Sequence, residues 1–187
     1  IKEYGFTLGI QLMIGLPGDS LESCIYSARE TVKTAPEIAR LYPTIIIEDT
    51  ELLEMYRRGE YTPLTLDEAV AVTKEMYRIL DAAGINIIRV GLKSTDIINS
   101  DGAVTGGTYH PAFRQLVESS IAREEIEKQL TATSGNISVM CNPSDISNAA
   151  GHNGCNRKYF AGKYPGLHIS FKKEESLDRN KYIVIQC

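Results

Sequence analysis

A glycine-rich turn, Gly15-Leu16-Pro17-Gly18, follows the apolar run 9–14 and offers the clearest chemistry in this sequence. The run predicts a buried strand, hydrophobic on both faces as in a parallel sheet, and Asp19 or Ser20 can cap the helix that Leu21 opens. Small residues let a backbone approach a ligand closely, and helix N-terminal amides at such a strand end face bound groups. The turn therefore predicts a ligand site. The alternative is a tight connection that exists for packing alone.

Two arginines, Arg40 and Arg89, lie inside stretches that otherwise have the apolar pattern of strands. An unpaired charge in such a strand is costly. We therefore expect each to face a cavity that holds a carboxylate, a phosphate or a substrate, or to pair with Glu48 or Asp96. Tyr42 could line the same cavity as the arginines. The alternative is that Tyr42 is an aromatic residue of the core.

A second glycine turn, Gly151-His152-Asn153-Gly154, joins two predicted helices, 143–150 and 155–164. A strand is predicted at 136–141, and a hairpin of strands at 167–172 and 181–185. This order resembles a KH-type RNA-binding module, whose Gly-x-x-Gly turn clamps a nucleic-acid backbone. The resemblance implies RNA contacts from Gly151, His152, Gly154, Arg157 and Lys158. A helix–turn–helix without a ligand is the alternative, and the third helix of a type I KH fold is missing from the pattern.

The remaining chemistry-bearing residues predict no further site. Cys24, Cys141, Cys155 and Cys187 fit no zinc knuckle, redox pair or iron–sulfur triplet, which indicates reduced thiols in a cytoplasmic protein. His110 has no second histidine nearby, so a packing role at a helix start is favoured over acid–base chemistry.

Composition indicates an ordinary globular protein of 187 residues, with 43% hydrophobic and 24% charged residues. No apolar run reaches the roughly 18 residues of a membrane span, so no membrane partner is expected. Charge is uneven: residues 1–149 carry a net −8 and residues 150–187 a net +4. A basic tail of this kind meets an anion such as RNA or is simply a solvated face.

The first part of the chain predicts alternating strands and helices. Strands are expected at 9–14, 38–42 and 85–92, and helices at 21–34, 51–57, 66–83 and 112–130. The first β-α-β unit predicts right-handed parallel pairing. Residues 93–109 have no periodicity and predict a functional or mobile loop.

Four motifs in residues 1–92 recur in an order typical of one family. They are Gly15-Leu16-Pro17-Gly18, Tyr42-Pro43-Thr44, the helix start Thr50-Glu51-Leu52, and Gly59-Glu60-Tyr61. The succession resembles the radical SAM superfamily, and within it the branch around the catalytic subunit of Elongator. The segment Tyr109-His110-Pro111-Ala112-Phe113, which leads into the predicted helix 112–130, is similar to bacterial Elongator-like proteins of the same superfamily.

The resemblance implies an α/β fold, namely the carboxyl-terminal half of a parallel (β/α) barrel followed by a small α+β tail. We expect residues 1–130 to form the barrel part with an extension, and residues 131–187 to form the tail. Half a barrel leaves an exposed strand edge, which predicts self-association. The chain also starts without Met, which suggests the carboxyl-terminal part of a longer protein.

For function, the resemblance implies an oxidoreductase-like enzyme that cleaves S-adenosylmethionine at a [4Fe-4S] cluster and uses a 5′-deoxyadenosyl radical, with tRNA or another RNA as substrate. It assigns cofactor contacts to Gly15, Leu16, Pro17, Gly18, Arg40 and Tyr42, and directs Arg89 towards the substrate. The Cys-x3-Cys-x2-Cys motif of the family is missing here, so this chain alone is expected to bind no cluster and to be inactive. The tail stands where Elongator has an acetyltransferase domain, which puts acetyl transfer in doubt. Two alternatives remain, an RNA-binding module and a non-catalytic structural or dimerising appendage.

Overall fold

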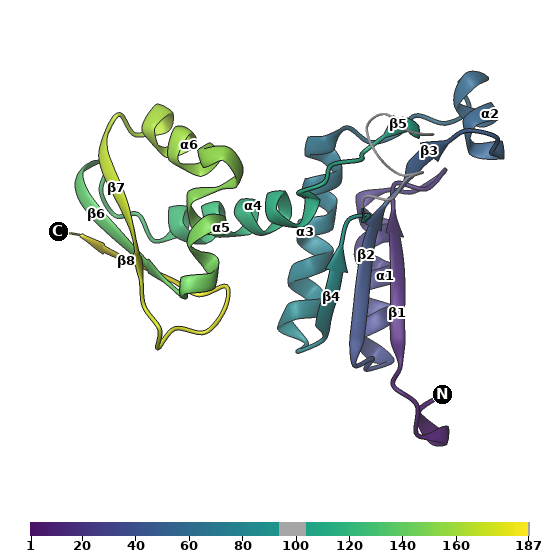
Figure 1. Ribbon diagram of the computed structural model, residues 1–187, viewed down its shortest axis with the longest axis horizontal. Helices are drawn as coiled ribbons and strands as arrows, with labels where there is room; N and C mark the ends of the chain where they lie inside the picture. The colour runs from purple at the N-terminus through teal and green to yellow at the C-terminus, as the bar shows by residue number, and fades with distance from the viewer. Residues whose placement is uncertain (94–103, 187) are drawn as a thin grey trace. The chain divides into compact units, whose positions relative to one another are not determined.

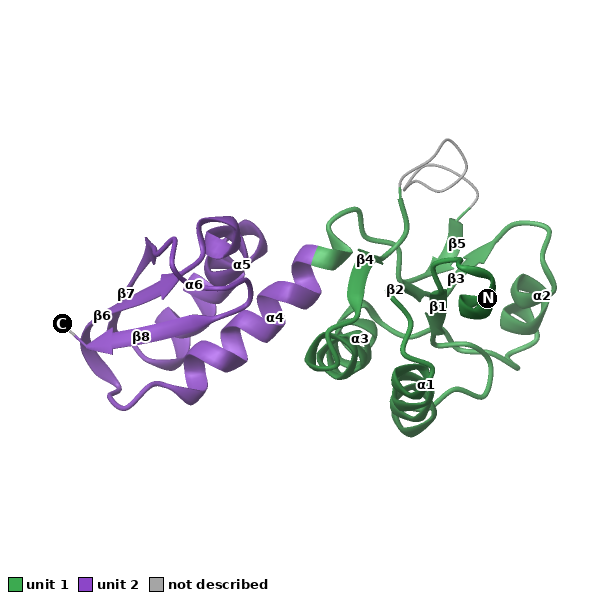
Figure 2. Ribbon diagram, turned by 90° about the horizontal axis from the view of Figure 1, so that it is seen from below, with its two compact units in different colours: residues 1–114 green, residues 115–187 purple. Residues whose placement is uncertain are grey.

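Three parallel strands form the centre of the first part of the chain: β1 (Gly9–Ile14), β2 (Ile38–Pro43) and β4 (Asn86–Val90), in the order β1-β2-β4 (Figure 1). The computed structural model describes residues 1–93 and 104–186. The chain divides into two compact units, residues 1–114 and 115–187 (Figure 2). A short 3-10 helix, η1 (Lys2–Tyr4), precedes β1. The α/β class and the parallel pairing agree with the sequence.

Helices α1 (Leu21–Lys33) and α3 (Leu66–Ala82) cover one face of this sheet (Figure 2). Each begins with a capping box, made by Ser20 with Ser23 and by Thr65 with Glu68, which satisfies first-turn amides. The covered face of the sheet buries a continuous apolar set, namely Ile14, Ala39, Leu41, Ile87 and Val90.

The other face of the sheet is open, which corrects the expectation that β1 is buried on both faces. Along β1, Gly9, Gln11 and Met13 are exposed, while Ile10, Leu12 and Ile14 are at least partly buried. Alternation of this kind belongs to a strand covered on one face only.

A two-stranded antiparallel sheet forms beside α2 (Glu51–Arg57), from β3 (Ile45–Ile47) and β5 (Val104–Gly107). Its small core joins Ile46, Leu53 and Tyr61. The predicted functional or mobile loop over 93–109 therefore contains a strand at 104–107 that was not predicted, and residues 94–103 lie outside the described part. The sequence did not predict this strand because two of its four residues, Gly106 and Gly107, are glycines. A Cβ at Gly107, where φ is +88°, would lie 2.9 Å from the carbonyl oxygen of Thr44, so only glycine fits.

The second unit contains helix α4 (Phe113–Lys128), of which residues 115–128 belong to it, and a mixed sheet in the order β7-β6-β8. Its further elements are β6 (Ser134–Cys141), η2 (Pro143–Asp145), α5 (Ile146–Ala150), η3 (His152–Gly154), α6 (Cys155–Lys163), β7 (Gly166–Lys173) and β8 (Tyr182–Gln186). β6 pairs parallel with β7 and antiparallel with β8. The predicted hairpin of 167–172 with 181–185 is therefore wrong, because β6 lies between the two strands.

One hydrophobic core holds this unit together, and α4 contributes to it. Ala122 and Ile126 of α4 pack in the same cluster as Val139 of β6, Phe160 of α6 and Leu167 of β7. The unit thus begins well before the expected boundary at 130/131, and a third helix is present, supplied from the amino-terminal side. The sequence showed the α4 helix but not which core it would join.

A carboxylate on α4 makes the stability of this unit depend on pH. Glu127 accepts hydrogen bonds from Tyr159 and Tyr164 at 3.0 and 2.8 Å and lies 2.8 Å from the Lys163 ammonium. Burial raises the pKa of Glu127, but the hydrogen bonds from Lys163, Tyr164 and Tyr159 more than offset it, so the pKa lies below its usual range.

We expect Glu127→Gln to destabilise the unit by about 1 kcal/mol at pH 7. Because the folded-state pKa is depressed, the contribution of Glu127 is present above the unfolded pKa and is lost as pH falls through the folded pKa. Urea unfolding at several pH values should show the difference between wild type and variant shrinking below about pH 4. A difference that stays constant over that range would contradict the assignment.

No helix among the described residues is long and apolar enough to cross a membrane.

Candidate functional site

The glycine turn after β1 is held in place by contacts within the first unit, beginning at Gly15. Gly15 has φ +79° and is buried, and a Cβ there would lie 3.0 Å from the side chain of Leu64. The hydroxyl of Tyr61 donates to the Gly15 carbonyl oxygen at 2.6 Å. Burial raises the pKa of this hydroxyl, so it remains a donor at neutral pH. Tyr61 of the Gly-x-Tyr motif thus holds the Gly-Leu-Pro-Gly turn in place through this hydrogen bond.

Tyr61→Phe should cost about 1 to 2 kcal/mol of unfolding free energy, because the buried carbonyl of Gly15 loses its hydroxyl donor. Tyr56→Phe is the matched control, since the Tyr56 side chain is 43% exposed. Urea denaturation of both variants checks the prediction. Equal stability of the two variants would show that the Tyr61 hydroxyl does not hold the turn.

The rest of the turn is partly committed to local hydrogen bonds. The Leu16 amide donates to the Asp19 carboxylate at 3.0 Å, and the Asp19 amide donates to the Leu16 carbonyl at 2.9 Å. Ser20 is the helix cap, while Asp19 closes the turn. Leu16, Pro17 and Gly18 remain exposed, and nothing lies within 4 Å of a Cβ built on Gly18. The surface that a ligand can reach is therefore 16–18, with Gly15 behind it.

The predicted strand residues share the open face of the sheet. Arg40 and Arg89 are exposed, and Tyr42 on the same face of β2 is half-buried. Among residues 1–93 and 104–186, neither arginine is paired with Glu48, whose carboxylate instead accepts a hydrogen bond from Thr105. The alternative partner, Asp96, lies outside the described residues. Gln11 and Met13 of β1 pair with Arg40 and Tyr42 in the parallel register and were not predicted. A polar residue inside the apolar run 9–14 was the signal for an open face.

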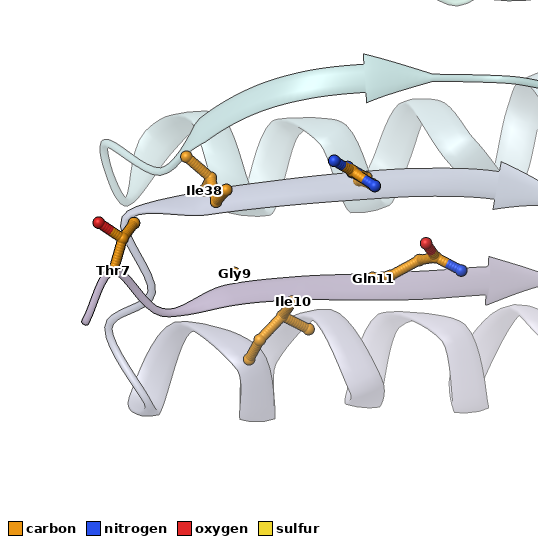
Figure 3. Close-up of a pocket in the computed structure, with 6 residues that line it drawn as sticks. Thr7, Gly9, Ile10, Gln11 and Ile38 are labelled. Carbon is orange, nitrogen blue, oxygen red and sulfur yellow. The ribbon is translucent and has the colours of Figure 1, made fainter. Parts of the chain in front are cut away.

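A shallow hollow of about 330 Å³ lies beside this face, near the amino ends of β1 and β2. Figure 3 shows Thr7 and Ile38 at one end of it and Gln11 further along β1. The hollow is therefore not at the carboxyl edge where the glycine turn sits, and the two features are separate parts of the first unit.

His110 makes a local hydrogen bond at the start of a helix, and its packing role stays a prediction. Its Nδ1 accepts a hydrogen bond from the Ala112 amide at 3.1 Å, immediately before α4. Asp101, nine residues before His110, lies outside the described residues.

The second glycine turn has two glycines with different roles. Gly151 is buried at φ +83° and ψ +154°, and a Cβ there would lie 2.5 Å from both the Asn156 nitrogen and the Cys155 Sγ. Gly154 has φ +72° and nothing within 4 Å of its Cβ position. Gly151 is thus required by packing against the start of α6, whereas Gly154 needs glycine only for its left-handed backbone.

The basic residues after this turn lie near a second hollow, of about 230 Å³, between α6 and β7. Arg157 and His168 line it together with Phe160 and Leu167. The Arg157 guanidinium also stacks 4.8 Å from the centre of the Phe171 ring, and Lys158 is exposed. His152 Nδ1 is hydrogen-bonded to Gln115 Oε1 at 2.9 Å. His168, to which the sequence assigned no role, joins the set because α6 packs beside β7.

The described residues contain no group of three or more His, Cys, Asp or Glu side chains placed to hold a metal ion. Cys24 and Cys141 are buried free thiols, and Cys155 is an exposed one.

Comparison with known proteins shows which family the chain resembles. Residues 36–123 match the family model described as the Radical_SAM C-terminal domain. The chain is 35% and 36% identical over 75 residues to the tRNA uridine(34) acetyltransferases of Methanocaldococcus jannaschii and Methanocaldococcus infernus. It is 36% identical over 66 residues to that of Dehalococcoides mccartyi. The matched part covers 38%, 38% and 34% of this chain, but only 14% of each relative.

Among solved structures, the archaeal M. infernus Elp3 with an N-terminal deletion (1–46) is similar, with a TM-score of 0.54 and 25% identity. The similarity covers 66% of this chain and 28% of that one. These matches confirm the resemblance to the radical SAM superfamily. They also confirm its narrower form: within the superfamily, the similarity is to the Elongator-like branch.

Proposed function

We propose that this chain is the carboxyl-terminal part of a radical SAM enzyme that modifies a uridine of tRNA. The observation that carries the proposal is the match of residues 36–123 to the radical SAM carboxyl-terminal domain, over a unit whose parallel sheet ends in the Gly-Leu-Pro-Gly turn. The names of the relatives support tRNA as the substrate. These relatives are much longer than the part that this chain matches. We also propose that the protein is cytoplasmic.

The residues at the carboxyl edge of the sheet fit an S-adenosylmethionine site. The exposed backbone of 16–18 offers an unobstructed surface, and the open space around Gly18 admits a planar group. The buried hydroxyl of Thr44, directly after β2, has no hydrogen-bond partner among the described residues, and a polar group bound nearby would satisfy it. Tyr42 and Arg40 extend this surface along the open face, with Arg89 towards the substrate.

The [4Fe-4S] cluster does not fit the described residues, which offer no grouped cysteine ligands. In the intact enzyme the cluster would supply the electron for reductive cleavage, and its ligands would come from another part of the protein. The proposed roles of this chain's own residues are to bind and orient the cofactor and the substrate. The glycine turn keeps side chains away from the cofactor surface, and Arg40 and Arg89 attract an anionic group. We therefore expect the isolated chain to be inactive.

The three parallel strands are proposed to complete a (β/α) barrel with strands from the rest of the protein. In the isolated chain, β1 is an edge strand with exposed apolar neighbours such as Phe6 and Met13. Exposed edges of this kind favour pairing with a second copy. Sedimentation of the isolated chain at rising concentration should show self-association.

The enzyme proposal is tested by 5′-deoxyadenosine formation in the cluster-reconstituted protein that contains this chain. Gly18→Val should lower the rate at least tenfold, because a branched side chain covers the proposed cofactor surface. Gly84→Val is the matched control, since Gly84, between α3 and β4, also has a positive φ and an open Cβ position. Absence of the product from the wild type would contradict the enzyme, and equal losses in both variants would remove the turn from the site.

A second candidate function is RNA binding by the unit 115–187. It is supported by Arg157 beside the hollow between α6 and β7, by the exposed Lys158, and by the open Gly154 at the start of α6. The KH-like reading of this unit is part of the proposal.

RNA binding by the full chain at low salt should weaken about tenfold in Arg157→Gln with Lys158→Gln, and should fall steeply with added salt. Lys181→Gln, at an exposed lysine before β8, is the control. An RNA shift that is absent from wild type, or that survives the double substitution, would favour a structural or dimerising appendage.

A further inference from the structure

Three polar side chains form one row across the open face of β1-β2-β4. In the parallel register, Gln11 of β1 pairs with Arg40 of β2, and Arg40 pairs with Arg89 of β4. All three residues are exposed. Ala39 and Leu41, the neighbours of Arg40 along β2, are buried on the helix-covered face. The row therefore lies on the face opposite α1 and α3.

An irregularity in β4 brings Arg89 into this row. Ala39 pairs with Ile87 and Arg40 pairs with Arg89, so Ile88 is an extra residue on β4. Both Ile87 and Val90 are buried, which leaves Ile88 and Arg89 together on the open side. A bulge of this kind re-aims a side chain and is common beside functional sites. Without the extra residue, Arg40 would have Ile88 as its neighbour.

The result is a pair of positive charges on neighbouring strands, with no counter-charge paired to them among the described residues. Neighbouring strands lie about 4.8 Å apart, so the two arginine side chains leave the sheet side by side. Among residues 1–93 and 104–186, neither guanidinium has a hydrogen bond or an ion pair. Two guanidinium groups on neighbouring strands repel each other, and each presents several N–H donors. Gln11 and Arg40 also line the hollow of about 330 Å³, whose other lining residues lie towards the amino ends of β1 and β2.

We propose that Gln11, Arg40 and Arg89 form one binding site for a phosphoryl group. A single guanidinium already matches a carboxylate in a bidentate pair, whereas two guanidinium groups and an amide match a phosphoryl group, with its larger number of charged oxygens. Arg40 and Arg89 then serve the same ligand group, rather than one the cofactor and the other the substrate. The site rests on the geometry of this sheet, and it stands or falls independently of the radical chemistry proposed above.

The first test measures binding of pyrophosphate to the whole chain by calorimetry at low ionic strength. Arg40→Gln and Arg89→Gln should each weaken binding at least tenfold, and acetate at equal ionic strength should not compete. Arg29→Gln, at an exposed arginine of α1 on the covered side of the sheet, should change the affinity less than twofold. Absence of binding to the wild type, or equal losses in all three variants, would overturn the site.

A competition experiment between RNA and pyrophosphate identifies the source of the phosphoryl group. A short single-stranded RNA that displaces pyrophosphate would identify an RNA backbone as the ligand. Failure of RNA to displace bound pyrophosphate would assign the site to a small phosphorylated compound. Both outcomes require that the arginine variants lose pyrophosphate binding.

A second test needs no ligand. If the two guanidinium groups are adjacent, Arg89→Glu should form a pair with Arg40 and raise the melting temperature by about 2 °C relative to Arg89→Gln at low salt. The gain should vanish when Arg40→Gln is combined with it. A gain that is absent, or that survives Arg40→Gln, would show that the row does not exist.

Discussion

Gly151→Ala is expected to unfold the unit 115–187, or to destabilise it by at least about 3 kcal/mol. Its φ of +83° with ψ of +154° lies in a region that is essentially restricted to glycine. The added methyl would also lie 2.5 Å from the Asn156 nitrogen, which is backbone and cannot move aside cheaply. Asn156 is itself held by hydrogen bonds from its side-chain amide to the carbonyls of Ser119 and Asn148.

The matched control for this prediction is Gly154→Ala in the same turn. Gly154 has a left-handed backbone but open space around its Cβ position, so the cost should be about 1 to 2 kcal/mol. Pulsed thiol labelling localises the effect, because each unit has a buried cysteine, Cys24 in α1 and Cys141 in β6. Burial raises the pKa of Cys141 to about 11, which keeps it unreactive while its unit is folded. Equal labelling of Cys141 in the two variants would contradict the assigned roles.

The second large effect is expected at Asp145, a fully buried carboxylate at the end of η2. It accepts hydrogen bonds at 2.8 Å from the Arg179 guanidinium and from the Asn180 amide. These bonds hold the segment between β7 and β8, which must travel past β6 for the two strands to flank it. Asp145→Ala should cost about 3 kcal/mol, because it leaves the Asn180 amide without its acceptor and a cavity in the core.

Asp178→Ala is the comparison for Asp145→Ala, since the Asp178 side chain is exposed in the same segment. It should change the unfolding free energy by less than about 0.5 kcal/mol. Urea unfolding, followed by labelling of Cys141, distinguishes the two variants. A small effect at Asp145 would mean that the segment is held by other contacts.

The strands and helices of the first unit could be predicted from local signals. The strand 9–14, the helix cap at Ser20 and the helix from Leu66 each combine periodicity with a terminator within a few residues. The open face of the sheet was missed, because an apolar strand reads the same whether other elements cover it or not. Only Gln11, a polar residue in the middle of the run, indicated exposure.

The second unit shows what sequence patterns leave out. β7 and β8 were recognised as strands, but each pairs with β6, and the segment between them contacts Asp145 through Arg179, 34 residues away. The two glycines of 151–154 look equivalent in sequence and differ completely in their surroundings. Likewise, Arg40 and Arg89 were both predicted as charges in strands, but their shared row depends on the extra residue in β4.

The measurement that tests the central claim most directly is the reading of the coding sequence upstream of Ile1 in the intact gene. If this chain is the carboxyl-terminal part of a radical SAM enzyme, the upstream sequence should encode a Cys-x3-Cys-x2-Cys motif on an earlier strand of the same barrel. A gene whose coding sequence starts near Ile1, or whose upstream part lacks that motif, would contradict the enzyme proposal. The chain would then have to be understood as a binding protein built on a radical SAM carboxyl-terminal domain.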